Sequence, residues 1–322
     1  MKISRETLTA QAEATGFRPD TLEKVALLLQ LLDAIHSHPF LKDRLVLKGG
    51  TALNIFIFAV PRLSVDIDLN YVGAANRETM LLERPKIEEA LQAVFSREGY
   101  TVRRVPTEHA GGKWQLRYPS ASGRGGNLEV DVNFMFRIPL WPVQRIDSRP
   151  VGIWQAAGIP VVDIHELAAG KLSALLSRRQ GRDLFDCSNL FRLGGFDRER
   201  LRLAFVVYGA MSRIDWRTIT PEDVAVDTVD LEQKLIPTLR SAWNENIRKE
   251  QYGVGLVEDC RNLLSGLLPF TALEQEFLDR ILDRGEIASE LLTGDEALQN
   301  RIRRHPLLEW KAVNVRGHKK GP

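Results

Sequence analysis

The chain has 322 residues, of which 44 are Lys or Arg and 42 are Asp or Glu, so its formal net charge at neutral pH is only +2. This length can bury a sizeable core and predicts two domains, while the balanced charge excludes nucleic-acid binding through global basicity. The two cysteines have no metal-ligand spacing, and no apolar run is long enough to span a membrane or to lead an exported chain. We therefore expect no disulfide framework, no zinc site, no membrane span and a cytoplasmic location.

Two helices and a short strand are predicted first. Residues 5–15 show a weak amphipathic pattern, and residues 19–38 carry a broad apolar stripe typical of a helix packed on a sheet. An apolar strand follows from Leu45 to Leu47. It ends at Gly49 and Gly50, where glycine permits backbone angles and close approaches that a β-carbon would prevent.

A short helix leads from this turn into an acidic strand. Thr51 is expected to cap the helix, which covers residues 52–58 and stops before Pro61. Residues 63–69 then alternate strictly between polar and apolar side chains, which predicts a β-strand.

Ser64, Asp66 and Asp68 share one face of this strand. Residues two apart on a strand are roughly 6.5 to 7 Å apart, so two carboxylates there can converge on bound metal ions. Without a cation they repel each other. The alternative interpretation is the solvated outer face of an edge strand.

One helix and three strands are predicted next. The helix covers residues 84–98, and the strands cover residues 100–105, 113–118 and 127–134. The glycine-rich segment 120–126 between the last two strands is expected to be a hairpin turn, with a phosphate-binding loop as the alternative.

The last of these strands carries another alternating acidic face with Glu129 and Asp131. Because neighbouring strands lie about 4.8 Å apart, Asp131 is predicted as a third carboxylate beside Asp66 and Asp68. Otherwise it pairs with an arginine or faces water.

After a connecting segment with a short strand at residues 159–162, Asp163 is predicted to cap a helix and to form a capping box with Glu166. Lys171 lies among leucines and alanines of this helix, a neighbourhood that a lysine accepts only with a partner or a task. It is predicted to bind an anionic triphosphate, unless its stem reaches solvent. Arg182 and Asp186 have the spacing of an ordinary surface ion pair.

From about residue 197 onward only helices are predicted, over residues 198–211, 231–246, 254–268, 271–284 and 286–292. We therefore expect a catalytic domain over residues 1–195 and a helical C-terminal domain over residues 196–322. The basic tail after Gln299 is either a disordered or solvated end or a contact for a phosphate backbone.

The order of these motifs resembles the DNA polymerase β-like nucleotidyltransferases, in which a glycine turn and a short helix precede Asp-x-Asp. More narrowly, the chain is similar to the AbiEii and MenT group of bacterial toxin nucleotidyltransferases. The resemblance rests on Lys48-Gly49-Gly50-Thr51-Ala52-Leu53, on Arg62-x-Ser64-x-Asp66-x-Asp68-Leu69, and on Lys171 with Arg182-Asp183-x-x-Asp186.

The resemblance implies an α/β (α+β) fold with a mixed sheet flanked by helices, and it implies roles for the residues already named. Catalysis would rest on Asp66, Asp68, Lys171 and Asp186. Metal ions, Mg²⁺ or Mn²⁺, would be bound by Asp66, Asp68 and Asp131. The nucleoside triphosphate would be bound by Lys48, Gly49, Gly50, Thr51, Arg62, Ser64, Arg182 and Asp183, with Asp183 and Asp186 orienting either Lys171 or the acceptor.

By the same resemblance, the chain would be the toxin of a toxin–antitoxin or phage-defence pair, restrained by a cognate antitoxin. It would transfer a nucleoside monophosphate to an RNA acceptor, the 3′ end of tRNA in MenT-like relatives. The alternatives are transfer to a small molecule or a protein, and a non-catalytic protein that binds nucleotides or a partner.

Overall fold

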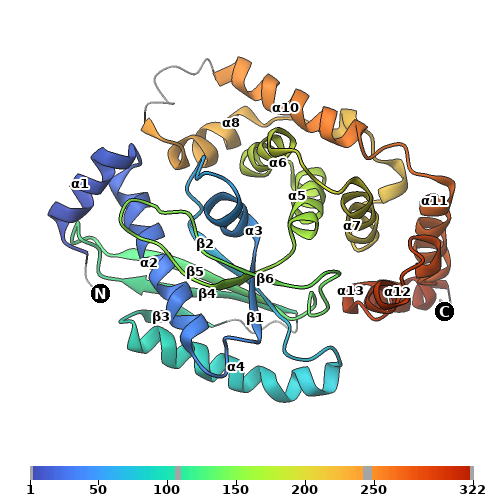
Figure 1. The fold of residues 1–322 in the computed structure, drawn as a ribbon, viewed down its shortest axis with the longest axis horizontal. Helices are drawn as coiled ribbons and strands as arrows, with labels where there is room; N and C mark the ends of the chain where they lie inside the picture. The colour runs from blue at the N-terminus through green and yellow to red at the C-terminus, as the bar shows by residue number, and fades with distance from the viewer. Residues whose placement is uncertain (1–2, 106–109, 242–248, 320–322) are drawn as a thin grey trace. The chain divides into compact units, whose positions relative to one another are not determined.

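The computed structural model describes residues 3–105, 110–241 and 249–319 (Figure 1). It divides into two compact units. The sheet unit comprises Met1–Arg137, Val143–Val162 and Ile236–Ile247, and the helical unit comprises Ile138–Pro142, Asp163–Leu235 and Arg248–Pro322. The boundary predicted after residue 195 separates a catalytic domain from a C-terminal domain. The two compact units are defined by packing alone and do not test that boundary, which stays a prediction.

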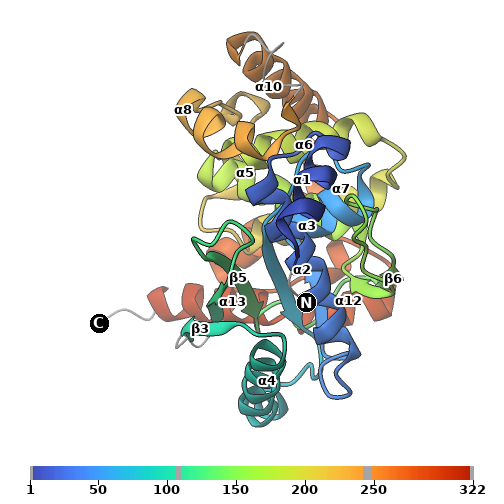
Figure 2. The same ribbon diagram turned by 90° about the vertical axis from the view of Figure 1, so that its left-hand side faces the viewer.

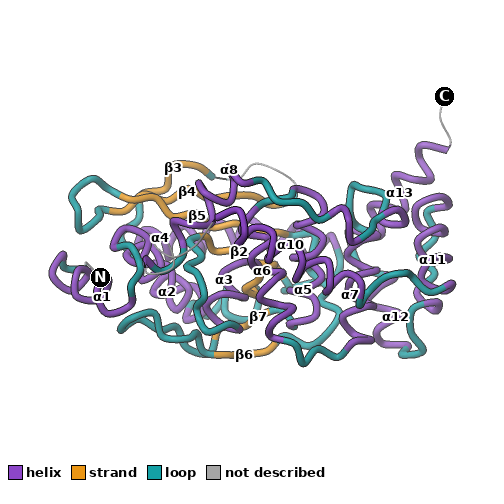
Figure 3. The backbone as a smooth tube through the Cα atoms, turned by 90° about the horizontal axis from the view of Figure 1, so that it is seen from above, coloured by secondary structure: helices purple, strands orange, loops and turns teal. Residues whose placement is uncertain are grey.

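The sheet unit contains a seven-stranded mixed sheet with the order β3-β4-β5-β2-β1-β7-β6, drawn in orange in Figure 3. β2 is parallel to β5, β1 is parallel to β7, and the other neighbours are antiparallel. The strands are β1 (Leu45–Lys48), β2 (Asp66–Tyr71), β3 (Thr101–Arg104), β4 (Gly111–Tyr118), β5 (Gly126–Asn133), β6 (Gln144–Ile146) and β7 (Ile159–Val161). The predicted mixed sheet and the hairpin between β4 and β5 are confirmed.

Helices cover one face of this sheet. The helices of the unit are α1 (Arg5–Thr15), α2 (Pro19–Ser37), α3 (Gly49–Thr51), η1 (Ala52–Ile57), α4 (Arg77–Arg97) and η5 (Ile236–Thr238). α2 packs against β2, β5, β7 and α4. α4 packs beside β3, as Figure 2 shows. Trp114 of β4 meets Phe95 of α4 edge to face at 5.5 Å between ring centroids. The polar side chains of the strands therefore lie on the opposite face.

In this unit one predicted helix start is wrong and one strand was not predicted. α4 begins seven residues before the predicted Arg84, because the side chain of Asn76 accepts a hydrogen bond from Thr79 N at 2.7 Å and caps the helix there. Pro85 lies inside the helix. β6 was not predicted, because its three residues include two exposed polar side chains, whereas the equally short β7 is an apolar run.

The helical unit is built around α5, which packs against α6 and α7, while α6 packs against α10. Every regular element described after Val161 is helical, as predicted. The α-helices are α5 (Ile164–Arg178), α6 (Gly181–Leu193), α7 (Arg198–Ala210), α8 (Thr228–Asp230), α10 (Lys249–Ser265), α11 (Ala272–Asp279), α12 (Glu296–Arg303) and α13 (Pro306–Lys319). The 3-10 and π turns are η2 (Trp216–Thr218), η3 (Pro221–Asp223), η4 (Leu231–Leu235), η6 (Arg280–Arg284) and η7 (Ser289–Leu291).

Two predicted helices are shorter than expected. The helix expected over residues 231–246 is replaced by η4 and η5, and residues 242–248 lie outside the described part of the chain. The helix expected over residues 286–292 contains only η7, since Gly285 in the left-handed region (φ 67°) ends the preceding helical segment.

The basic tail is folded as far as Lys319, so the disordered alternative is wrong for α12 and α13. Ile302, Leu308 and Ala312 are buried there. Arg301, Lys311 and Arg316 donate to the carbonyls of Leu140, Ser212 and Gly285. Among the residues that the structure describes, no helix is both long and apolar enough to cross a membrane.

Candidate active site

Aspartates from two neighbouring strands form a row of carboxylates on the polar face of the sheet. Asp66 and Asp68 are two residues apart on β2, so their side chains point to the same side. β2 and β5 run parallel, with Asp68 opposite Asp131 and Asp66 opposite Glu129. Directly opposed residues share a face of the sheet. The predicted position of Asp131 beside the Asp-x-Asp pair is therefore confirmed.

The apolar residues between these acids fix their direction. Ile67 and Leu69 of β2 and Val130 of β5 are fully buried against the helices. Burying each such side chain stabilises the fold by about 1.5 to 3 kcal/mol, whereas a slip of one residue would exchange the two faces. The core thus holds the carboxylate row on the polar face.

Gly49 brings the glycine turn into contact with this row. Its backbone has a φ of +75°, which favours glycine, and a β-carbon placed there would lie 2.3 Å from Asp68 Oδ2. Any other residue would clash with the Asp68 carboxylate unless that carboxylate moved. The sequence Lys48-Gly49-Gly50 therefore packs directly against the acidic strand.

Thr51 does not cap a helix, contrary to the prediction. α3 begins directly at the glycine turn, with Lys48 in the N-cap position and no side-chain cap, so Thr51 already lies inside the helix. Its fully buried hydroxyl donates instead to the carbonyl of Asp66 at 2.6 Å. This bond joins the helix to the first residue of β2 and so positions Asp66.

The predicted phosphate-binding residues of this unit lie in different surroundings. Lys48 is opposite Asp68 on β1, and its Nζ lies 5.6 Å from the centroid of the Phe136 ring. Arg62 is only 2% exposed, and its Nη1 donates to the Leu63 carbonyl at 3.0 Å. Ser64 is buried and precedes β2, which begins at Asp66, so the acidic strand is shorter than predicted.

Lys113 of β4 belongs to the same face and was not predicted. It lies opposite Asp131, and its Nζ contacts Glu129 Oε2 at 3.0 Å. The hydrogen bond to Glu129 raises the pKa of Lys113, and the charges of Asp66 and Asp68 act in the same direction. The hairpin register, which the glycine-rich turn sets, is the sequence signal that could have placed this lysine.

A second cluster of charges lies within the helical unit. Lys171 Nζ of α5 contacts Asp183 Oδ1 at 2.8 Å and Asp186 Oδ2 at 2.9 Å, both on α6. Arg178 Nε contacts Asp183 Oδ2 at 2.7 Å. Burial opposes the charge of Asp183, but Lys171 and Arg178 outweigh it and lower the pKa of this carboxyl. Both aspartates therefore hold Lys171 in place, while the predicted catalytic and binding roles of these residues stay predictions.

Asp186 is fully buried in this cluster, so its pairing with Lys171 replaces the surface ion pair with Arg182 that its spacing had suggested.

Asp163 caps α5 as predicted, by accepting a hydrogen bond from His165 N at 2.9 Å. The capping box with Glu166 is wrong, because the Glu166 carboxylate accepts instead from Leu140 N, Trp141 N and the Tyr208 hydroxyl. Burial raises the pKa of Glu166 to about 7.

The carboxylate row suits a hard divalent cation. Among the described residues, no group of three or more His, Cys, Asp or Glu side chains is arranged to hold a metal ion. Mg²⁺ commonly uses only one or two carboxylates and takes its remaining ligands from water and substrate phosphates. The carboxylate oxygens of Asp66, Asp68 and Asp131 are of the chemical kind that this ion prefers, whereas the described part of the chain offers no His or Cys set for zinc.

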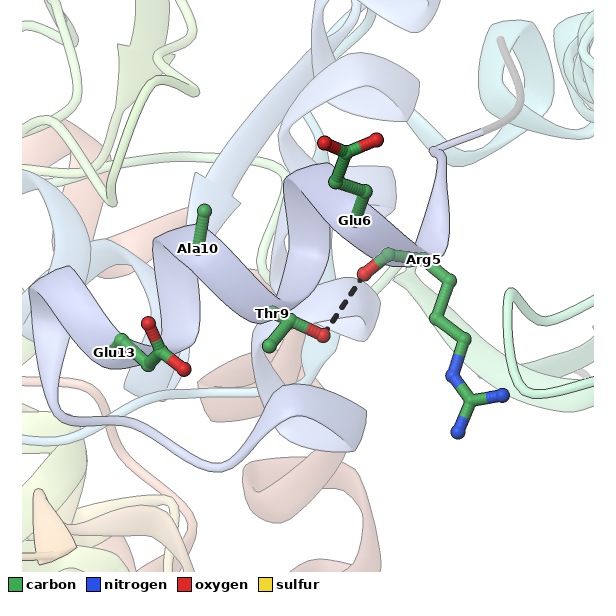
Figure 4. Close-up of a pocket in the computed structure, with 5 residues that line it drawn as sticks. All are labelled: Arg5, Glu6, Thr9, Ala10 and Glu13. Atoms are coloured by element: carbon green, nitrogen blue, oxygen red, sulfur yellow. Dashed lines mark hydrogen bonds between the residues drawn. The ribbon is translucent and has the colours of Figure 1, made fainter.

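A surface depression on α1 has different properties. It is lined by Arg5, Glu6, Thr9, Ala10 and Glu13, and Figure 4 shows these residues along a single helix, with Thr9 Oγ1 donating to the Arg5 carbonyl at 3.0 Å. None of the predicted site residues takes part. One side of one helix offers no converging catalytic groups, so the carboxylate row remains the candidate active site.

An Asp-x-Asp pair, a third aspartate on the parallel neighbouring strand and an adjoining glycine turn on a mixed sheet define the class of nucleotidyltransferases. In such enzymes the protein mainly positions phosphates and neutralises their charge.

Comparison with known proteins gives the family. A family model described as the nucleotidyl transferase AbiEii toxin of a type IV toxin–antitoxin system matches residues 30–264. The chain belongs to this family, so it is a nucleotidyltransferase toxin, and family membership implies an antitoxin partner.

A solved structure of MenT4, a nucleotidyltransferase toxin from Mycobacterium tuberculosis H37Rv, shares the fold. It aligns with a TM-score of 0.59 and 17% identity over 98% of this chain and 99% of that chain. A search of curated protein sequences gave no match.

Proposed function

We propose that this toxin transfers a nucleoside monophosphate from a nucleoside triphosphate to the 3′ hydroxyl of an RNA, with tRNA as the acceptor. The observation that carries the proposal is the row of Asp66, Asp68 and Asp131 beside the glycine turn of Gly49. MenT4, which shares the fold, is a nucleotidyltransferase toxin, and this likeness supports the same reaction type. We further propose a magnesium requirement and a cytoplasmic site of action in toxin–antitoxin or phage-defence biology.

The reaction is an in-line displacement at the α-phosphorus. The 3′ oxygen of the acceptor forms a bond to the α-phosphorus while the bond to the bridging oxygen breaks, and pyrophosphate leaves. The hydroxyl proton passes to solvent. Most of the catalytic task is to hold the two substrates in line and to balance negative charge.

Asp66, Asp68 and Asp131 would hold the divalent cation. When bound, the cation supplies charge neutralisation at the phosphates and favours the deprotonated form of the acceptor hydroxyl. The Thr51 hydroxyl, which is bound to the Asp66 carbonyl, keeps that strand end in place. Because Gly49 has no side chain, its backbone can lie directly against the Asp68 carboxylate, which would bring the amides of the glycine turn close to phosphates bound at the row.

Cationic groups of the sheet unit would serve the same reaction. Lys48 lies across from Asp68 and would bind phosphate oxygens, with the amides of Gly49 and Gly50 beside it. Arg62 and Ser64 would add to this set from the segment before β2. We also propose a catalytic role for Lys171, which Asp183 and Asp186 orient within the helical unit, and a nucleotide-binding role for Arg182.

A label-transfer assay tests the proposal. Purified protein is incubated with bulk tRNA and each α-labelled ribonucleoside triphosphate in turn, with and without Mg²⁺. We expect labelled tRNA with the wild type, and a loss on the order of 10³-fold for Asp66→Asn, because a carboxylate that binds the cation is lost.

Asp43→Asn is the matched control, since it removes a carboxylate that is 62% exposed and forms only a surface pair with Arg145. It should keep full activity. A folded Asp66→Asn protein with wild-type transfer would overturn the assignment of the row. Label appearing only on protein or small molecules would overturn the RNA acceptor.

A further inference from the structure

The polar face of the sheet continues from the carboxylate row to a basic edge. Asp66 lies opposite Glu129, Glu129 lies opposite Gln115, and Gln115 lies opposite Arg104. These pairings form one row across β2, β5, β4 and β3. The catalytic carboxylates and Arg104 therefore share one face of the same sheet.

Four arginines make up this basic edge, which we define as Arg103, Arg104, Arg117 and Arg124. All four are exposed. Within the described ranges, none of them forms an ion pair with a carboxylate, although other arginines of the unit, such as Arg44, do. Positive charge that no neighbouring acid neutralises is available for an anionic partner.

The local geometry gathers these side chains. The pairing of β3 with β4 shifts between Val102 and Arg104, so Arg103 is the extra residue of a bulge. A bulge sets two residues opposite one and redirects their side chains, which brings Arg103 and Arg104 together opposite Gln115. Arg117 lies alongside the hairpin turn, where a β-carbon on Gly125 would be 3.3 Å from its Nε.

An alternative role for these four arginines, to prevent the exposed edge of the sheet from pairing with another chain, would explain only some of them. Charged residues on an edge strand prevent pairing with another chain, and lysine is the usual choice. β3 is the edge strand, but Arg117 lies on β4, which is paired on both sides. Arginine, with its planar fork of donors, is suited to phosphate groups.

The spacing fits a polynucleotide whose end reaches the carboxylates. Three strand separations of about 4.8 Å place Arg104 roughly 14 Å from Asp66. At a rise of about 3.4 Å per nucleotide, this distance corresponds to about four stacked nucleotides. A chain with its 3′ end at Asp66 would thus bring its upstream phosphates to the basic edge.

We propose that the basic edge binds the phosphate backbone of the RNA acceptor just upstream of its 3′ end. The inference rests on the proposed nucleotidyl transfer and adds the surface that holds the acceptor. It explains how a chain with a net charge of only +2 binds RNA, because the charge is local.

The test is a salt series on the full-length protein. Binding of fluorescently labelled bulk tRNA is measured for the wild type, for the triple variant Arg103→Gln, Arg104→Gln, Arg117→Gln, and for a control triple variant. The control, Arg5→Gln, Arg77→Gln, Lys86→Gln, removes the same charge from exposed positions on α1 and α4. Binding of a fluorescent nucleoside triphosphate is recorded in parallel.

Three lost phosphate contacts remove about 2 to 3 from the slope of log affinity against log salt. Between 50 and 200 mM salt the wild type should therefore lose about 20- to 40-fold more affinity than the basic-edge variant. The control should follow the wild type, and all three proteins should bind the nucleotide equally.

Wild-type salt dependence in the basic-edge variant, or an equal loss in the control, would overturn the proposal. So would a wild type that does not bind tRNA. These results leave nucleotide transfer by Asp66 and Asp68 untouched. Conversely, tRNA binding through the basic edge without any label transfer would contradict the proposed function. The role of the basic edge in RNA binding would then still stand.

Discussion

Gly49→Ala tests whether the glycine turn positions the carboxylate row. A β-carbon at this residue would lie 2.3 Å from Asp68 Oδ2 and 3.1 Å from Asp68 Cγ, and the φ of +75° is itself unfavourable for alanine. Placing a residue with a β-carbon at this positive φ costs about 1 to 2 kcal/mol of stability, which we call the backbone term. To restore ordinary contact, the Asp68 carboxylate must move by roughly 1 Å, and a displacement of this size can lower the rate about 100-fold.

The chain offers a matched control for the backbone term. Gly99 has a φ of +85°, and a β-carbon there would meet nothing within 4 Å. Gly99→Ala should therefore lose a similar stability in a urea titration while keeping full label transfer.

The clash can also be isolated by a double-mutant cycle. In an Asp68→Ala background, Gly49→Ala should cost only the backbone term, because the carboxylate that it meets is absent. Stability is measured by urea unfolding, and activity by transfer of label to tRNA. The reasoning is refuted if Gly49→Ala keeps wild-type activity, or if its stability loss is the same with and without the Asp68 side chain.

Three further variants probe the buried polar contacts. Lys171→Met should destabilise the protein by about 3 to 5 kcal/mol in urea because it removes a cation that contacts two buried aspartates. Arg178→Ala, at a side chain that is 54% exposed, should cost about 1 kcal/mol or less. Thr51→Val should cost about 1 to 3 kcal/mol and lower label transfer, because the Asp66 carbonyl loses its donor. Glu166→Gln should remove a pH dependence of stability, of about 3 kcal/mol at most, because the pKa of Glu166 is raised from 4.5 to about 7.

The sign of the Glu166 effect follows from proton binding. The folded protein keeps a proton that the unfolded chain releases, so this stability is complete below pH 4.5 and is lost as the pH rises to about 7. Urea midpoints across this range should fall more steeply for the wild type than for Glu166→Gln. If the urea midpoints of the two proteins fall equally with pH, the pKa of Glu166 is not raised in the folded protein. Equal effects of Lys171→Met and Arg178→Ala, or an unchanged Thr51→Val protein, would likewise contradict the assigned contacts.

The sequence predicted the carboxylate row because its physical causes are local. Alternation in β2 and β5 fixes which side chains share a face, and glycines mark the turn beside them. The pairing of Asp68 with Asp131 needed only the additional assumption that the two strands are neighbours.

What the sequence did not reveal depends on contacts between distant segments. Lys113 joins the row through the register of a hairpin, and the Thr51 hydroxyl binds a carbonyl fifteen residues away instead of a helix end. Glu166 follows the capping residue Asp163 by three residues, as a capping box requires. Its carboxylate nevertheless accepts hydrogen bonds from the backbone N–H groups of Leu140 and Trp141 instead. Local spacing shows that such a bond is geometrically feasible but does not show which competing partner is closer.

The parallel pairing of β2 with β5 has a consequence for synthesis of the toxin. Asp68 and Asp131 meet although about 60 residues separate them, and contacts over such separations form slowly because a long loop must close first. A growing chain cannot complete the acid row until β5 has left the ribosome and docked. If transfer needs the complete row, as proposed, a nascent or prematurely terminated chain that ends before β5 would be inactive.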